Sequence, residues 1–257
     1  MLCIYNAFGY EWDWQDRYRL IKEAGFEGVM LWWSDGFGRG PGYRQDVDRA
    51  RKAGLMVENL HAPVRGQDDL SLDNQAGEAL LECHLGCVRD CAQYQVPVVV
   101  VHLPKDRFPL SGLGMDRLKG IVELAERLGV RVAFENIFNT RNLARALREI
   151  PSERAGFCYD SCHHANDPEA PDLLEQYGNR LMALHLHDNG GERGQHQLPF
   201  DGRIDWPGVM GKIAAAGYSG PTSLEPMNWG YESLGLEEFL RRACEKGKEL
   251  ETLRFGK

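Results

Sequence analysis

The sequence lacks the features expected of a membrane protein or a nucleic-acid-binding protein. It contains no run of 18 apolar residues, so we expect no transmembrane helix. It has no run rich in lysine or arginine, and its formal net charge is -8, which argues against nucleic acid as the default partner. Residues 1–6 do not combine a charged segment with an apolar one, so they are typical of a strand and not of a signal peptide.

Cysteine is too sparse for a disulfide framework. Seven cysteines in 257 residues suit a reducing compartment better, and we therefore expect a cytoplasmic protein. Cys83, Cys87 and Cys91 recur every four residues, beside Leu80 and Val88. That spacing predicts one buried helix face, on which the cysteines act as small hydrophobic residues and not as a metal cluster.

A pattern of helix, glycine and strand repeats along the chain. Amphipathic stretches end in Gly25, Gly54, Gly129 and Gly217, and an apolar segment follows each within a few residues. Glycine ends a helix readily because it adopts the left-handed conformation at little cost. The repeat predicts parallel strands joined by crossover helices. The predicted strands cover residues 2–8, 28–33, 56–61, 97–103, 131–136, 156–161, 181–187 and 221–225, and the predicted helices cover 12–24, 44–53, 74–94, 114–128, 141–149, 171–178, 206–216 and 236–250.

Eight such units in about 250 residues are typical of a (β/α)8 TIM barrel, a fold of the α/β class. The rival fold, a doubly wound open sheet, is disfavoured because no glycine-rich dinucleotide fingerprint follows the first predicted strand. No linker or low-complexity stretch divides the chain, so we expect one domain over residues 1–257.

Residues able to bind a metal or move a proton stand at the ends of six consecutive predicted strands. In a barrel of this type, the carboxyl ends of the strands form the active-site face. A single histidine or glutamate at a strand end is usually structural, but six together indicate a site. Carboxylates and imidazoles that converge there suit a divalent ion such as Mn²⁺, Mg²⁺ or Co²⁺, with Zn²⁺ as a further option. The six residues are His61, His102, Glu135, Asp160, His185 and Glu225.

The seventh predicted strand carries a pair of histidines. His185 and His187 are two residues apart, so on a strand both side chains point to the same side. An imidazole pair at the end of an apolar strand is costly to bury unless something binds it. This stretch is therefore the centre of the predicted site.

Five motifs on these strand ends resemble those of the xylose-isomerase-like barrel superfamily. That superfamily includes sugar isomerases and epimerases, inosose-processing enzymes, hydroxypyruvate isomerase and endonuclease IV. Each motif is weak by itself, but their order along almost the whole chain carries the resemblance. They are Phe134-Glu-Asn136, Tyr159-Asp-Ser-Cys-His163, His185-Leu-His-Asp-Asn189, Gly202-Arg-Ile-Asp-Trp206 and Ser223-Leu-Glu-Pro226.

The resemblance implies one divalent metal ion at the strand ends. It also implies that His163, in the Asp-x-x-His pattern, contacts substrate. The implied metal ligands are Glu135, Asp160, His185 and Glu225.

The choice between the two neighbouring histidines stays open at this point. The family's His-x-x-Asp pattern fits His185 followed by Asp188, which favours His185 as the ligand. If His187 were the ligand instead, Arg193 would match the substrate-binding arginine of ketose 3-epimerases.

The resemblance and the residues together point to an isomerase or epimerase of a small ketose or keto-polyol. Such a reaction removes a proton from a carbon next to a carbonyl, and a metal ion stabilises the enediolate that forms. Glu135 and Glu225 stand on different strands, so one carboxylate can remove the proton and the other can return it. No phosphate-cradling glycine loop is evident, which favours an unphosphorylated substrate. Relatives commonly form homodimers or homotetramers, so either assembly is compatible with the resemblance.

Further side chains are candidates for contact with the carbohydrate. Phe8 and one tryptophan, taken here as Trp33, are expected to form an apolar wall; because neighbours on a strand alternate, Trp32 or Trp33 must face the helices. His196 lies in the long loop after the seventh strand, where it could close over substrate or remain a solvated loop residue. The other candidates on this rim are Tyr5, Phe37, His61, His102, His163, His187 and Arg193.

The main alternative is a metal-dependent phosphodiesterase that acts on abasic DNA, as endonuclease IV does. The three-zinc cluster of that enzyme uses additional ligands, and His61, His102, His163 and His196 stand at matching positions. Gly194 replaces the aspartate expected two residues before His196, which should weaken such a cluster. A sugar-binding barrel without catalysis is disfavoured because both glutamates and the Asp-x-x-His pattern are present. About one ion per chain would support the isomerase, and three zinc ions the nuclease.

Overall fold

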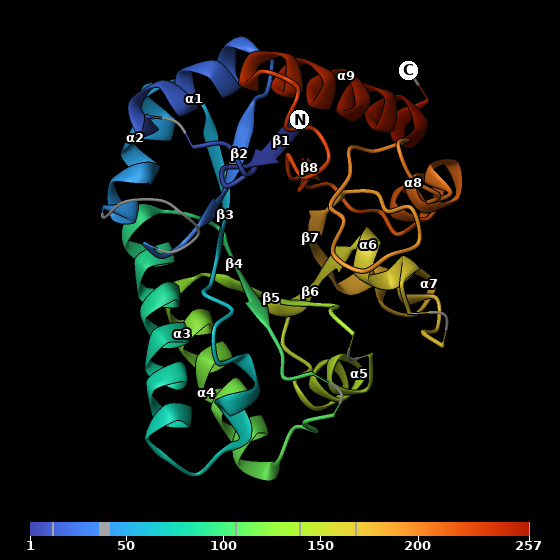
Figure 1. Cartoon of the computed structure of the whole chain (residues 1–257). Helices are drawn as coiled ribbons and strands as arrows, with labels where there is room; N and C mark the ends of the chain where they lie inside the picture. Colours follow the sequence, from blue (N-terminus) through green and yellow to red (C-terminus); the bar gives the residue numbers. More distant parts are fainter. Residues whose placement is uncertain (12, 36–41, 106, 139, 168, 257) are drawn as a thin grey trace.

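Eight parallel strands form a nearly closed barrel that the helices surround (Figure 1). The computed structural model describes residues 1–11, 13–35, 42–105, 107–138, 140–167 and 169–256. Strands β1 to β7 follow one another around the barrel in sequence order, and β8 pairs with β1. The strands are β1 (Leu2–Tyr5), β2 (Gly28–Trp32), β3 (Met56–His61), β4 (Val98–His102), β5 (Arg131–Glu135), β6 (Ala155–Asp160), β7 (Leu181–His185) and β8 (Thr222–Leu224).

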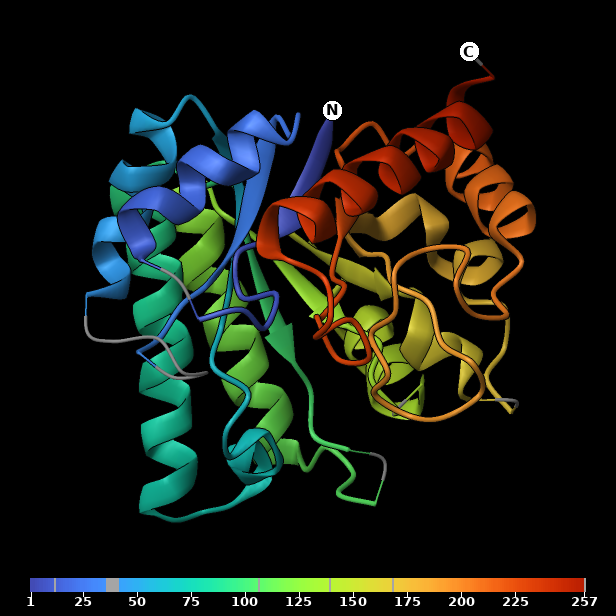
Figure 2. The same ribbon diagram turned by 45° about the horizontal axis from the view of Figure 1, so that its top comes forward.

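The helices form the outer layer, and the last of them lies against both its predecessor and the first (Figure 2). Contacts of α9 with α8 and α1 complete the ring of helices on the side where the chain begins. The described α-helices are α1 (Trp14–Glu23), α2 (Asp46–Lys52), α3 (Gln75–Tyr94), α4 (Gly112–Leu128), α5 (Thr140–Glu149), α6 (Ser161–Ala165), α7 (Leu173–Tyr177), α8 (Trp206–Ala215) and α9 (Leu236–Phe255), with 3-10 turns at η1 (Tyr43–Gln45), η2 (Gln67–Ser71) and η3 (Gly178–Arg180).

The barrel closes where β7 meets β8. The amide of Leu186 donates to the carbonyl of Ser223 at 2.9 Å, and the amide of Glu225 donates to the carbonyl of Leu186 at 3.0 Å. These bonds lie just beyond the ends of the two strands. They therefore bring His185 and Glu225, which are 40 positions apart, to the same part of the rim.

A β-bulge in β3 decides which of its side chains face the barrel interior. Val29 pairs with Val57 and the next residue of β2 pairs with Asn59, so Glu58 is an extra residue on β3. Val57 and Leu60 both pack in the outer core. Glu58 and His61 both face inward, although strict alternation would send residues three apart to opposite faces.

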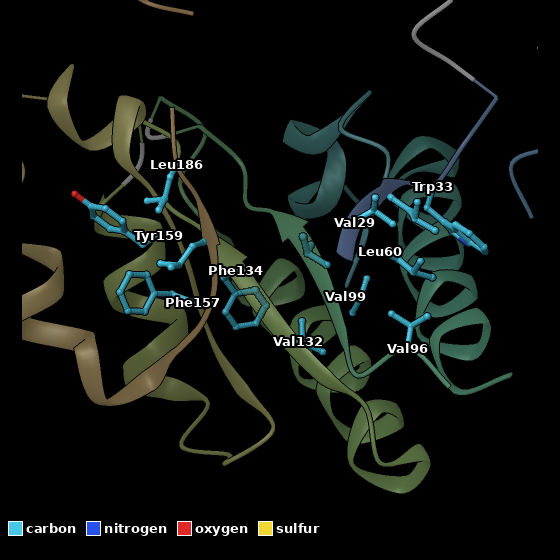
Figure 3. Packing of buried hydrophobic residues seen from close by; sticks show 14 of the residues in the cluster. Val29, Trp33, Leu60, Val96, Val99, Val132, Phe134, Phe157, Tyr159 and Leu186 are labelled. Atoms are coloured by element: carbon cyan, nitrogen blue, oxygen red, sulfur yellow. The ribbon is translucent and has the colours of Figure 1, made fainter. Parts of the chain in front are cut away.

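The main apolar core lies between the strands and the helices. Large side chains fill it, and Figure 3 shows several of them on the outer faces of the strands. The middle of the barrel interior is filled by a separate cluster of small residues, so it is a packed layer and not a pore. That inner cluster comprises Val98, Val100, Ala133, Cys158 and Ala183.

The predicted (β/α)8 barrel is confirmed, and the differences concern the ends of elements. The first strand ends at Tyr5 and not at residue 8. The last helix continues beyond residue 250 to Phe255, because buried Leu250 and Arg254 extend its packed face and Gly256 supplies the left-handed cap. The helix expected at 171–178 is present as α7, and a further short helix that was not predicted, α6, directly follows β6. Among the helices described, none is both long and apolar enough to span a membrane.

Candidate metal centre

Glu135, at the end of β5, lies at the centre of four histidines. Its Oε2 atom is 3.0 Å from His102 Nε2, 3.1 Å from His185 Nδ1 and 3.3 Å from His61 Nε2. Its Oε1 atom is 3.2 Å from His163 Nδ1. These side chains come from β3, β4, β5 and β7 and from helix α6, so the strand ends converge as expected for this fold.

Asp160 and Glu225 extend the same cluster. His163 Nδ1 is 3.4 Å from Asp160 Oδ2, and His185 Nδ1 is 3.4 Å from Glu225 Oε2. His187 Nε2 lies 2.8 Å from Asp160 Oδ2 and 3.8 Å from Glu225 Oε2. One continuous set of contacts therefore includes the four predicted metal ligands, namely Glu135, Asp160, His185 and Glu225.

Two histidines of the cluster are oriented by hydrogen bonds at Nδ1 and direct Nε2 at the Glu135 carboxylate. His61 Nδ1 contacts the carbonyl of Ala62 at 2.8 Å, and His102 Nδ1 contacts Gln67 Oε1 at 3.1 Å. Since only a donor satisfies these acceptors, the Nδ1 atom of each ring carries a proton. The Nε2 atoms of both rings face Glu135 Oε2. Outer hydrogen bonds of this kind orient metal-binding histidines in proteins.

Other ligand-type atoms of the cluster are also buried without hydrogen-bond partners. They include both ring nitrogens of His185 and one ring nitrogen each of His163 and His187. Buried polar atoms are rarely left unsatisfied. Overlapping groups of three residues have ligand atoms within 4.8 Å of one another, among them Glu135 with Asp160 and His163. The donors present therefore fit a divalent ion.

Electrostatic interactions keep Glu135 and Asp160 ionised. Burial by itself would raise the pKa of Glu135, but His102 and its neighbours hold that pKa well below the usual range. Burial would lower the pKa of His163, but Asp160 and Glu135 raise it to about 9. In contrast, burial lowers the pKa of His196 to about 4, so this ring is neutral at physiological pH.

The Asp-x-x-His pattern has a local structural cause. Asp160 ends β6 and caps helix α6, because its Oδ1 accepts a hydrogen bond from the amide of His163 at 2.6 Å. The first turn of this helix places the His163 ring back over the strand ends. Asn136 fixes the strand end further, since its Oδ1 accepts from the Asp160 amide at 2.7 Å. The pattern thus positions both an acid and an imidazole.

Asp188 organises the loop after β7 and is not part of the ligand cluster. Its Oδ2 accepts hydrogen bonds from the amide of Phe200 at 2.9 Å and from Trp206 Nε1 at 2.7 Å. Its Oδ1 accepts from the amides of Asn189 and Ile204 at 2.8 and 3.1 Å. This buried carboxylate explains why the His-x-x-Asp motif occurs together with the motif at 202–206.

A cavity of about 140 Å³ opens beside the cluster. Trp229, which is 45% exposed, stands at its rim with its ring edge-on to His196 at 5.4 Å. The His196 ring in turn stacks on His187 at 3.9 Å, and its Nδ1 lies 3.1 Å from the carbonyl of Glu225. The lining residues are Tyr5, Ala7, Trp32, His61, Val64, His102, Glu135, His163, His196, Glu225, Met227 and Trp229.

The expected positions of Phe8 and Trp33 are wrong. Phe8 is fully buried and packs against Phe239 in the outer core. Trp33 faces the helices, where its Nε1 donates to Asp90 Oδ2 at 2.7 Å. Trp32 takes the place on the cavity wall, because it alternates with Trp33 along the chain.

Arg193 also lies off the cavity wall. Its guanidinium stacks over the Phe138 ring at 4.3 Å, so it does not line the cavity in this structure. Phe37 lies outside the described residues. The sequence analysis missed Val64, Met227 and Trp229, which lie in loops after strands; only their place beyond strand ends would have indicated them.

The sequence profile described as Xylose isomerase-like TIM barrel matches residues 18–245 of this chain. The chain belongs to that family. Uncharacterized protein y4fM of Sinorhizobium fredii is 39% identical over 109 residues, which make up 42% of this chain and 34% of the relative. Uncharacterized protein MJ1311 of Methanocaldococcus jannaschii is 27% identical over 187 residues, or 66% of this chain and 64% of the relative.

This chain is also similar to Fructoselysine 3-epimerase of Shigella flexneri. The two are 24% identical over 119 residues, which make up 43% of each chain. This chain thus spans less than two thirds of the length of these curated relatives. Among solved structures, the IOLI protein with a bound zinc atom superimposes with a TM-score of 0.81 at 17% identity, covering 100% of this chain and 99% of that one. The D-psicose 3-epimerase of Clostridium cellulolyticum H10 with D-tagatose superimposes with a TM-score of 0.77 at 14% identity. The match covers 98% of this chain and 99% of that one. At such identities the likeness shows a shared fold.

Proposed function

We propose that this protein is a divalent-metal-dependent isomerase or epimerase of a small, uncharged ketose or keto-polyol. The observation that carries the proposal is the convergence of histidine ring nitrogens from several strand ends on the buried carboxylate of Glu135. The printed names of the epimerases among its relatives and structural neighbours agree with this reaction class.

In this proposal Glu135, Asp160, His185 and Glu225 hold the ion. A bound divalent ion supplies positive charge that stabilises negative charge developing on neighbouring substrate oxygens. Glu135 and Glu225 end β5 and follow β8, so they reach the cavity from different sides. One carboxylate removes the proton next to the carbonyl and the other returns it.

His187 has a supporting position in the same scheme. It lies against Asp160 at 2.8 Å, whereas His185 lies 3.1 Å from Glu135 Oε2, so we assign His187 to holding Asp160 and keep His185 as the ligand. His61, His102, His163 and His196 line the cavity and are proposed to contact the substrate hydroxyls.

The size and lining of the cavity limit the substrate. A protein cavity of about 150 Å³ holds benzene, a molecule of about six non-hydrogen atoms, and the cavity here measures about 140 Å³. No lysine or arginine is among the described residues that line it. The enclosed part therefore suits an uncharged chain of three or four carbons, and a longer ketose would extend past Trp229.

Exchange of carbon-bound hydrogen tests the proposal. The protein, loaded with Mn²⁺ in deuterated water, is incubated with dihydroxyacetone, erythrulose, ribulose and fructose, and deuterium uptake is followed by NMR. Metal-dependent uptake that falls with chain length is expected. No uptake from any ketose with any of Mn²⁺, Mg²⁺, Co²⁺ or Zn²⁺ would overturn the function, whereas faster exchange of fructose would overturn only the size limit.

The presence of two separate groups of possible ligands supports one other candidate function, a metal-dependent phosphodiesterase. His61, His102 and Glu135 form a group separate from that of His187, His196 and Glu225, which leaves room for more than one ion. Metal analysis together with a cleavage assay on abasic DNA distinguishes the two functions. About one ion per chain and no cleavage are expected; three zinc ions with cleavage would replace the isomerase by the nuclease.

A further inference from the structure

A second cavity lies at the opposite end of the barrel, where the strands begin. Its volume is about 370 Å³, within the range of small-molecule sites. The starts of β3, β4, β5 and β7 and the loop between α8 and β8 surround it. Residues that line it include Met56, Glu58, Arg131, Met182, Tyr218 and Pro221.

Glu58 is the buried acid of this cavity. Its side chain is 3% exposed, and Ser223 Oγ donates a hydrogen bond to its Oε2. Its Oε1 is buried and has no hydrogen-bond partner. Burial raises the pKa of this carboxyl to about 7, and the partners that lower this pKa, among them Ser223 and the Cys3 thiol, offset burial only in part. The β-bulge in β3 is what aims Glu58 inward.

Tyr218 adds a second unsatisfied polar atom. Its hydroxyl is buried without a hydrogen-bond partner, and the electrostatic influence of Glu58 reaches it. The ring is held in place because Arg254 stacks over it at 4.9 Å and donates to the carbonyl of Gly220 at 3.0 Å. A side chain at position 220 would collide with the Tyr218 hydroxyl, so the glycine there leaves room for the Tyr218 side chain.

Arg131 supplies the opposite charge on the same cavity wall. It lies at the start of β5 and is half-buried, and it influences Glu58 electrostatically. No ion pair within 4.0 Å joins its guanidinium to a carboxylate in the part of the chain that the structure describes. A separated acid and cation across a cavity complement a ligand that carries both charges.

We propose that this cavity binds a small zwitterion of the α-amino acid class. The ammonium group lies against Glu58 Oε1 and the Tyr218 hydroxyl, and the carboxylate lies against Arg131. The site is separated from the metal centre by the small apolar residues that fill the middle of the barrel. It does not depend on the proposed isomerase activity.

Calorimetric titration of the full-length protein with L-serine and with glycerate tests the site. Both probes carry a carboxylate, but only serine carries the ammonium group. We expect saturable binding of serine, tighter than that of glycerate. Glu58→Gln should weaken serine binding about tenfold or more, because it removes a charged hydrogen bond, and should change glycerate binding far less. Arg131→Gln should weaken both probes.

Two controls keep the test decisive. Glu225→Gln, at the other end of the barrel, should leave serine binding unchanged. Tyr218→Phe retains the ring and should weaken serine binding by several fold even if Glu58→Gln fails to fold. Absence of saturable binding, tighter binding of glycerate, or equal affinity in the parent and in Arg131→Gln and Tyr218→Phe would overturn the proposal.

Discussion

The two ends of the barrel interior both contain buried charge, but they stabilise it differently. At the carboxyl end, Glu135 is surrounded by histidines that hold its pKa low. At the amino end, Glu58 has one hydroxyl donor and a pKa raised to about 7. Between them lies a layer of small apolar side chains. The comparison shows that the same barrel keeps one acid ionised by surrounding it with histidines and compensates the burial of the other acid only in part.

The sharpest difference expected between the ends concerns proton transfer. Glu225→Gln should reduce metal-dependent deuterium exchange by about 10²- to 10⁴-fold, the usual contribution of a general acid or base. The exposed Glu82 on α3 provides a matched control, and Glu82→Gln should exchange like the parent. Equal exchange in Glu225→Gln and the parent would remove this carboxylate from the mechanism.

The next largest effect concerns the hydrogen bonds of Asp188, which hold the loop after β7 at the carboxyl end of the barrel. Asp188→Asn replaces one carboxylate oxygen by an amide NH2. That NH2 would face groups that now donate hydrogen bonds to Asp188, such as Trp206 Nε1. We expect a loss of about 3 kcal/mol in the free energy of unfolding, measured with urea, since a buried network is broken. The exposed Asp73→Asn is the control and should change stability little. A loss no larger than that of the control would contradict the assigned role of Asp188.

The amino end should give the protein a distinctive pH dependence. Burial raises the pKa of Glu58 from 4.5 to about 7, so the folded protein binds its proton more tightly than the unfolded chain. Stability from this group is present below about pH 4.5 and is lost as the pH rises through 7. Relative to Glu58→Gln, the parent should lose about 3 kcal/mol of unfolding free energy between pH 4 and 8.

Urea unfolding of the parent and Glu58→Gln at several pH values measures this difference directly. Because both proteins share every other titrating group, their difference isolates Glu58. A difference that stays constant with pH, or that grows in favour of the parent as pH rises, would show that the folded protein does not raise the pKa of Glu58.

The smallest expected effects are those of substitutions at two neighbouring tryptophans, which should differ in whether they lower stability or activity. Trp33→Phe removes the hydrogen bond to Asp90 and some packing, so it should cost about 1–2 kcal/mol of stability and leave kcat/KM unchanged. Trp32→Phe alters the cavity wall and should change kcat/KM more than stability. Thermal melts and steady-state kinetics of both variants check this; the reverse assignment of effects would contradict the observed orientations.

The fold could be predicted from the sequence because its signal is local and repeated. Helices that end in glycine before apolar strands indicate βα units, and the number of units indicates a barrel. The candidate ligands could be predicted for the same reason, since a residue at the end of a parallel strand lies on the common rim. Element ends such as that of α9 could not, because they depend on packing by residues such as Arg254.

Alternation along one strand identified a pair of tryptophans but not which of them faces the cavity. That choice depends on the register of β2 with its neighbours, which a single sequence does not encode locally. The bulge that turns Glu58 inward is invisible in the sequence for the same reason, since it is defined only by pairing with β2. The contact of His187 with Asp160 likewise joins residues 27 positions apart.

By itself, the sequence determined that six of the eight predicted strands would carry acids and imidazoles to one rim, because strand direction and strand ends follow from the order of the chain. Only the tertiary structure decided how these groups face one another and that a buried acid with a raised pKa lies at the far end of the barrel. The physical reason is that lone pairs, burial and unsatisfied hydrogen bonds depend on neighbours that are distant along the chain.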